Sequence, residues 1–94
     1  MEQKTIRAQV FGIVQGVCFR DYTRRKAEEL GLGGWVKNRS DGSVEALICG
    51  PSAGVEEIVS WLRHGPPHAH VERVEIDNET EPPQPPPASF QILF

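Results

Sequence analysis

The chain has few cysteines, no long apolar run and no excess of positive charge. Its two cysteines, Cys18 and Cys49, are too few for a disulfide scaffold, and their spacing matches no zinc-binding pattern. No segment of about 20 apolar residues could span a membrane, and the first ten residues lack the apolar stretch of a signal peptide. The net charge of -3 gives no general attraction to nucleic acids or anionic membranes. We therefore expect a cytoplasmic protein with reduced thiols and no nucleic-acid or membrane partner, in which any anion site is local.

The length of 94 residues allows one core and little else. We therefore expect a single domain over residues 1–94. A small domain with one core needs no second subunit to close its sheet, which favours a monomer.

Apolar periodicity predicts the order of the elements. Alternating side chains indicate strands over residues 5–11, 70–76 and 90–94, and a hairpin over residues 33–50 that turns at Asp41-Gly42. Helical spacing indicates one helix from Phe19 to a stop at Gly31, and a second helix that follows the candidate cap Ser52 and ends at "HGPP".

This order is typical of the α+β class with the ferredoxin-like split βαβ arrangement. Two helices with apolar stripes would pack on one face of a four- to five-stranded, mainly antiparallel sheet. The proline-rich segment 82–87 cannot pair in a sheet, because proline lacks the N–H donor. It is either a stiff connector before the last strand or a polyproline ligand for a partner domain.

The segment "VQGVCFR", residues 14–20, lies where the first strand turns into the first helix. The first N–H groups of a helix have no partners within it and favour an anion, and a preceding glycine lets the backbone approach a ligand closely. Arg20 could hold two oxygens of a phosphate or carboxylate at once. The segment is therefore either an anion cradle or an ordinary turn whose arginine meets a surface carboxylate. It matches neither a Walker motif nor a dinucleotide fingerprint.

Residues 12–50 resemble the acylphosphatases, whose pattern joins a G-x-V-Q-G-V-x-F-R loop to a G-W-V-x-N-x-x-D-G-x-V-E hairpin. The likeness extends from about Ile6 to Val74, weakens across the prolines and returns loosely in "FQILF". The fold of that family agrees with the arrangement predicted from periodicity.

The resemblance implies a phosphate site. Arg20 matches the arginine that binds the substrate phosphate, and Asn38 matches the asparagine that positions the attacking water. The loop backbone at Gln15, Gly16, Val17, Cys18 and Phe19 would complete the cradle.

An acyl phosphate is already activated, so its hydrolysis needs only an aligned water and donors for the developing charge. The resemblance therefore implies metal-independent hydrolysis of small acyl phosphates to a carboxylate and inorganic phosphate, with no cofactor. Asn38 could alternatively be a turn residue that only satisfies local backbone groups.

Other side chains leave further alternatives. Cys18 lies where many relatives carry glycine or an aromatic residue, and its thiol is either a nucleophile or a bystander. His64, His68 and His70 are either part of a metal site or a solvated loop.

Two other kinds of protein share the predicted architecture. One is an RNA-binding module, which the acidic charge and the lack of aromatic residues on the first strand disfavour. The other is the acylphosphatase-like domain of hydrogenase-maturation proteins, which belongs to a longer chain with zinc-finger cysteines. The absence of such cysteines favours a free-standing enzyme.

Overall fold

The computed structural model describes residues 2–16, 18–79 and 83–94. Its elements follow the predicted order, and both β1 and β4 extend beyond the predicted ranges. The bounds are β1 (Gln3–Ile13), α1 (Phe19–Glu29), β2 (Gly33–Asn38), β3 (Val44–Pro51), α2 (Ser52–Leu62), β4 (His70–Asn78) and β5 (Phe90–Leu93).

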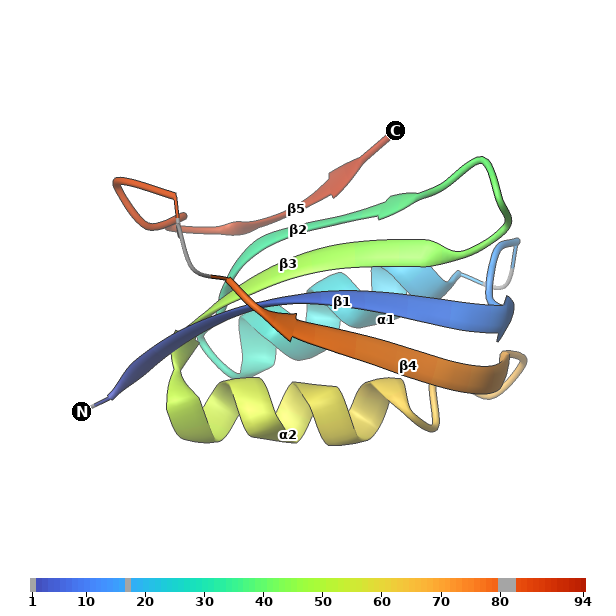
Figure 1. The fold of residues 1–94 in the computed structure, drawn as a ribbon, viewed down its shortest axis with the longest axis horizontal. Coiled ribbons are helices and arrows are strands. Elements are labelled where there is room, and N and C mark those ends of the chain that lie inside the picture. The colour runs from blue at the N-terminus through green and yellow to red at the C-terminus, as the bar shows by residue number, and fades with distance from the viewer. Residues whose placement is uncertain (1, 17, 80–82) are drawn as a thin grey trace.

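The strands form one sheet in the order β4-β1-β3-β2-β5. The pairs β1/β4, β1/β3 and β2/β3 are antiparallel, whereas β2/β5 is parallel. Both helices lie on the same face of the sheet (Figure 1). The α+β, ferredoxin-like prediction is confirmed, with five strands and one parallel pair.

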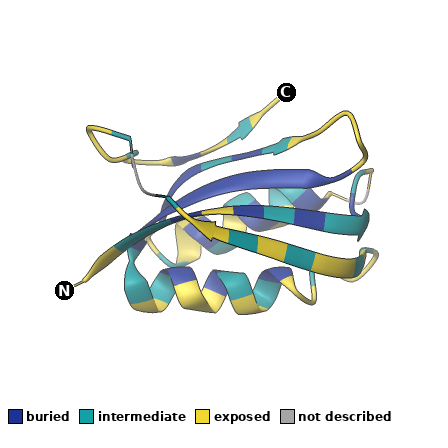
Figure 2. Ribbon diagram, in the orientation of Figure 1, coloured by how far each residue is buried: buried dark blue, intermediate teal, exposed yellow. Residues whose placement is uncertain are grey.

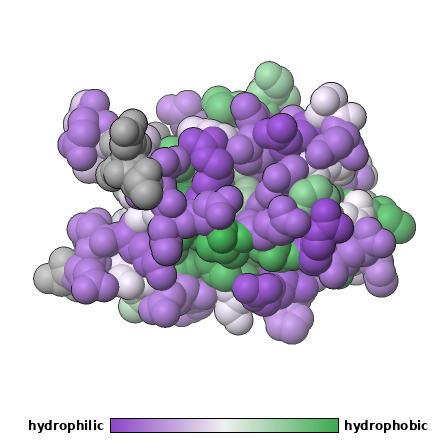
Figure 3. All heavy atoms as spheres, viewed as in Figure 1, coloured by the Kyte–Doolittle hydropathy of each residue, from purple (hydrophilic) through white to green (hydrophobic). Residues whose placement is uncertain are grey.

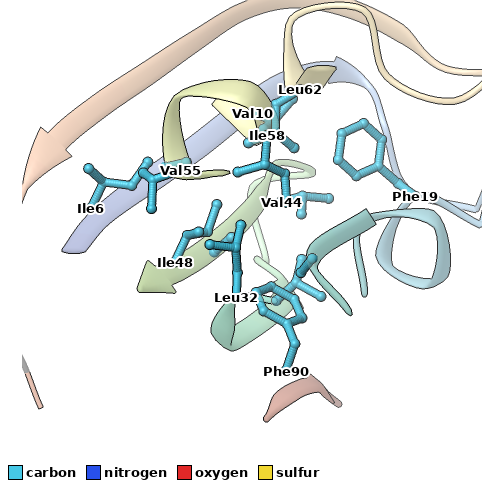
Figure 4. Close-up of a cluster of buried hydrophobic side chains, with 14 of the residues drawn as sticks. Ile6, Val10, Phe19, Leu32, Val44, Ile48, Val55, Ile58, Leu62 and Phe90 are labelled. Atoms are coloured by element: carbon cyan, nitrogen blue, oxygen red, sulfur yellow. The ribbon is translucent and has the colours of Figure 1, made fainter. Parts of the chain in front are cut away.

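The core lies between this face and the helices (Figure 4). Alternate residues of β1 and β3 point into it, because successive side chains of a strand face opposite sides. Helix α2 contributes Val55, Ile58 and Leu62 at helical spacing, each at most 1% exposed. The contacts that hold the helices to the sheet are therefore almost wholly apolar.

Strand β3 is buried along nearly its whole length, on both of its faces (Figure 2). On the face away from the helices, Leu47 lies opposite Arg7 of β1 and Trp35 of β2. The Arg7 guanidinium lies over the Trp35 ring at 5.6 Å, so these long side chains cover the central strand.

Helix α1 ends in a Schellman motif, as its glycine predicts. Gly31 has φ 70°, its N–H donates to the Glu28 carbonyl at 3.1 Å, and the Leu32 N–H donates to Ala27 at 2.8 Å. The prediction that Ser52 caps α2 is wrong. Pro51 is the N-cap residue and Ser52 is the first helical residue, because the Ser52 N–H donates to the Glu2 carbonyl at 2.9 Å and β3 leads straight into the helix.

The connector returns the chain to the far edge of the sheet, beside β2. Residue 82 of the predicted connector lies outside the described residues, and residues 83–87 form no helix or strand. The Pro87 carbonyl packs so closely against Gly33 that a Cβ there would collide with it. The Gly34 N–H then donates to Ser89 at 3.0 Å, which sets the start of β5.

The surface is mostly hydrophilic, with an apolar area between β4 and α2 (Figure 3). A groove of about 390 Å³ runs there, with walls that include Ile6, Val55, Val59 and Ile76. Within the described part of the chain, no helix combines the length and the hydropathy that a membrane crossing requires.

Candidate active site

The loop between β1 and α1 presents the N-terminus of the helix to a pocket. Gly16 has φ 76° and Cys18 has φ 61° and ψ 25°, both in the left-handed region. This conformation turns the chain sharply, so that Phe19 is buried in the core while Cys18 remains exposed. No described side chain caps the helix, so the N–H groups of its first turn remain available to an anion.

The pocket has a volume of about 380 Å³. Its walls come from three places: the loop and first turn of α1, the end of β2, and the end of β5. The lining residues are Val14, Gly16, Cys18, Phe19, Arg20, Asp21, Asn38, Ile92 and Phe94.

Arg20 and Asn38 therefore line one pocket, although 18 positions separate them in the sequence. Asn38 is the last residue of β2 and has the same parity as the core residue Val36, so it lies on the helix side of the sheet. The hairpin tip and the start of α1 lie at the same end of the sheet (Figure 1). The register of the sheet thus brings the carboxamide to the loop.

Strand β5 supplies contacts to Arg20 that sequence reasoning missed. The Arg20 Nη1 donates to the Leu93 carbonyl at 3.1 Å, and its guanidinium lies 4.8 Å from the centre of the Phe94 ring. Among the described residues no carboxylate forms an ion pair with Arg20. The alternative of an ordinary turn, whose arginine meets a surface carboxylate, is therefore not observed. The alternation of apolar residues in "FQILF" predicted strand β5, but nothing in the sequence indicated that this strand pairs with β2.

Gln15 joins the loop to the hairpin through its side chain. Its Nε2 donates to the carbonyls of Arg39 at 2.8 Å and Ser43 at 2.9 Å. Gln15 does not line the pocket, whereas Gly16, Cys18 and Phe19 do. Val17, also predicted for the cradle, lies outside the described residues.

The charge in the pocket is unevenly distributed. Arg20 is the sole cation among the described lining residues, and Asp21 is the sole carboxylate side chain. A hydrogen bond from Arg24 lowers the pKa of Asp21, and the charges of Arg25 and Arg24 add to this effect. The Arg24 and Arg25 guanidinium groups lie 2.9 and 2.8 Å from the two Asp21 oxygens, so the Asp21 charge is largely compensated.

The remaining candidates lie apart from this arrangement. His64, His68 and His70 are all exposed. In residues 2–16, 18–79 and 83–94, no three His, Cys, Asp or Glu side chains are grouped so as to hold a metal ion. Both cysteines are free, Cys18 at the pocket and Cys49 buried in the sheet.

Comparison with known proteins shows which family this chain resembles. The family model described as Acylphosphatase matches residues 6–92. An acylphosphatase from Thiobacillus denitrificans is 55% identical over 78 residues, which are 83% of this chain and 86% of that protein. This chain belongs to the acylphosphatase family.

Solved structures of the family have the same fold. The structure of an acylphosphatase from Coxiella burnetii aligns with a TM-score of 0.88 and 40% identity, over 97% of this chain and 93% of that one. The HypF of T. kodakarensis aligns with a TM-score of 0.84 and 34% identity over 97% of this chain, but over only 12% of its own. The acylphosphatase fold therefore also occurs as a small part of a much longer protein.

Proposed function

We propose that the pocket at the start of α1 hydrolyses acyl phosphates, with Arg20 and the loop amides binding the phosphate and Asn38 orienting water. The protein is an acylphosphatase, a hydrolase of acyl phosphates, by its family membership. The observation that carries the mechanism is that Arg20 and Asn38 line one pocket at an uncapped helix N-terminus.

The chemistry needs few groups, because the acyl phosphate is an activated mixed anhydride. Water attacks phosphorus, the bond between phosphorus and the acyl oxygen breaks, and the carboxylate leaves with the bonding pair. The attacking water becomes part of the phosphate product, which retains its protons. Arg20 and the N–H groups of Gly16, Cys18 and Phe19 would meet the phosphoryl oxygens as their charge redistributes.

Asn38 suits the second role because its carboxamide carries no charge. Its oxygen would accept a hydrogen bond from the water, while its N–H₂ group is a donor. A carboxylate at this position would repel the dianion. Gln15 would hold the phosphate-binding loop in a fixed position relative to Asn38, since its side chain binds the hairpin next to Asn38.

We propose a single domain over residues 1–94 that works as a cytoplasmic monomer without a cofactor. Both cysteines are free, as a reducing compartment would keep them.

The test measures hydrolysis of benzoyl phosphate in the presence of a chelator, together with inhibition by inorganic phosphate. We expect Arg20→Ala to lower kcat/KM by at least about 10²-fold and to weaken phosphate inhibition, because a preorganised donor is lost. Asn38→Ala should lower kcat by about 10²-fold with phosphate inhibition retained. Arg63→Ala, an exposed arginine after α2, is the matched control and should match the wild type. An unchanged rate in Arg20→Ala would rule out the mechanism.

A further inference from the structure

The walls of the pocket differ in chemistry. The loop side carries backbone N–H groups and Arg20, whereas the β5 side carries the apolar side chains of Ile92 and Phe94. The phosphate of a substrate would occupy the loop side. The rest of the substrate must then extend along the remaining walls.

The register of the β2/β5 pair explains why these two apolar residues face the site. Val36 lies opposite Ile92 and Lys37 opposite Leu93, and Asn38 and Phe94 are the next residues of the chain after this last pair. Phe90 is buried in the core, and Ile92 and Phe94 share its parity, which places them on the helix side of the sheet.

Phe94 is fully exposed, although its ring lies 4.8 Å from the Arg20 guanidinium. Only one face of the ring can meet the cation, and the remaining surface is in contact with water. Apolar surface gains free energy when it is removed from water, so this ring offers a contact for an apolar group held next to the phosphate.

We propose that Ile92 and Phe94 form an acyl-group subsite that selects acyl phosphates with apolar, uncharged acyl groups. The inference rests on the proposed function and specifies its substrate class. Arg20, the sole cation among the described lining residues, would be engaged by the phosphate. A second anionic group on the acyl chain would therefore lie against apolar walls without a partner, which is unfavourable.

The experiment compares three substrates with the full chain: acetyl phosphate, benzoyl phosphate and 4-carboxybenzoyl phosphate. We expect Phe94→Ala to lower kcat/KM for benzoyl phosphate by about tenfold, and for acetyl phosphate by less than about threefold, because only the larger group covers the ring. The measured quantity is the ratio of kcat/KM for benzoyl phosphate to kcat/KM for acetyl phosphate. Comparing this ratio between variant and wild type removes the difference in intrinsic reactivity between the two substrates. The wild type should use 4-carboxybenzoyl phosphate at least about tenfold less well than benzoyl phosphate.

Gln91→Ala is the matched control, since Gln91 lies on the same strand with its side chain on the other face, and the substrate ratio should not change. Inhibition by inorganic phosphate distinguishes two roles of Phe94. In one role its ring contacts the acyl group of the substrate, and in the other it only holds Arg20 in place to bind the phosphate. An equal loss for acetyl and benzoyl phosphate, with weaker phosphate inhibition, would overturn the subsite and show that Phe94 acts only through Arg20. An unchanged ratio would also overturn it. Turnover of acetyl phosphate by the wild type tests the proposed function separately.

Discussion

Cys18 adopts a backbone conformation that glycine reaches more easily. Its φ of 61° and ψ of 25° place it in the left-handed region, where a Cβ crowds the following carbonyl. The residue stands directly before α1 and lines the pocket together with the first residues of the helix. The thiol is exposed there, and the strain lies in the backbone, so we expect glycine to fit this position better than cysteine.

Cys18→Gly should therefore stabilise the protein and keep its activity. We expect the free energy of unfolding to rise by about 0.5–1 kcal/mol, which is the relief of strain less the extra chain entropy of glycine. Urea denaturation measures this change. Cys18→Ser is the matched control, because it removes the thiol and keeps the strained backbone, and it should leave both stability and kcat/KM nearly unchanged. Loss of hydrolysis in both variants would instead indicate a nucleophilic thiol.

The strands β1, β2 and β3 are linked by one carboxylate on the face away from the helices. Glu45 of β3 is 10% exposed in its side chain and meets Arg7 at 3.2 Å, Arg39 at 2.7 Å and Lys37 at 3.9 Å. Arg39 directly follows Asn38, and its carbonyl accepts the Gln15 hydrogen bond. Glu45 thus supports the end of β2 from the side opposite the pocket.

The ionisation of Glu45 makes stability depend on pH. Burial raises the pKa of its carboxyl, but the hydrogen bonds and charges of Arg7 and Arg39 outweigh burial and hold the pKa below its ordinary value. A lowered pKa means that this stabilisation is complete above the unfolded pKa, about 4.3, and is lost as the pH falls through the folded pKa.

Glu45→Gln should accordingly be less stable than the wild type near neutral pH. The difference should shrink as the pH falls below about 4.3, since the wild-type carboxyl then gains a proton. Urea midpoints recorded from about pH 7 to about pH 2.5 measure the difference. Glu56→Gln, on the exposed face of α2, is the control and should follow the wild-type curve. A gap between Glu45→Gln and the wild type that stays constant down to the lowest pH would contradict the role of the charge.

At the scale of the whole molecule, the two helices differ in their relation to the pocket. The pocket lies at the N-terminus of α1, while α2 packs against β1 and β3 and contributes no residue to the pocket lining. Ile58, in the middle of α2, is fully buried. We therefore expect stability and activity to be separable by mutation.

Ile58→Val and Ile58→Ala test this separation. We expect the free energy of unfolding to fall by about 1 kcal/mol for valine and by about 2–5 kcal/mol for alanine, because methyl groups are lost and a cavity remains. Denaturation curves measure the losses, and kcat per folded molecule should be unchanged. Val59→Ala, half-buried on the same helix, should cost less than Ile58→Ala. A drop in kcat for the folded Ile58→Val protein would show that the core and the pocket are coupled.

Much of the fold was predictable from the sequence. The period of two in the strands and the period near four in the helices record which side chains face the core, and Gly31 marks the end of α1 through its own conformation. The loop and hairpin motifs predicted Arg20 and Asn38 as site residues, because both motifs depend on residue types at short spacing, and the structure places both residues at one pocket. Such signals depend on residues close together in the chain, so they can be recognised from the sequence alone.

Only the tertiary structure decided how distant segments meet. The parallel pairing of β5 with β2 brings Ile92 and Phe94 into the pocket, the Gln15 side chain binds the hairpin, and Glu45 joins three strands. Pro51, not Ser52, stands at the cap of α2, because the direct passage from β3 sets where the helix begins. Strand order and register follow from which distant surfaces pack best against one another, and alternation within a single strand carries no record of its neighbour.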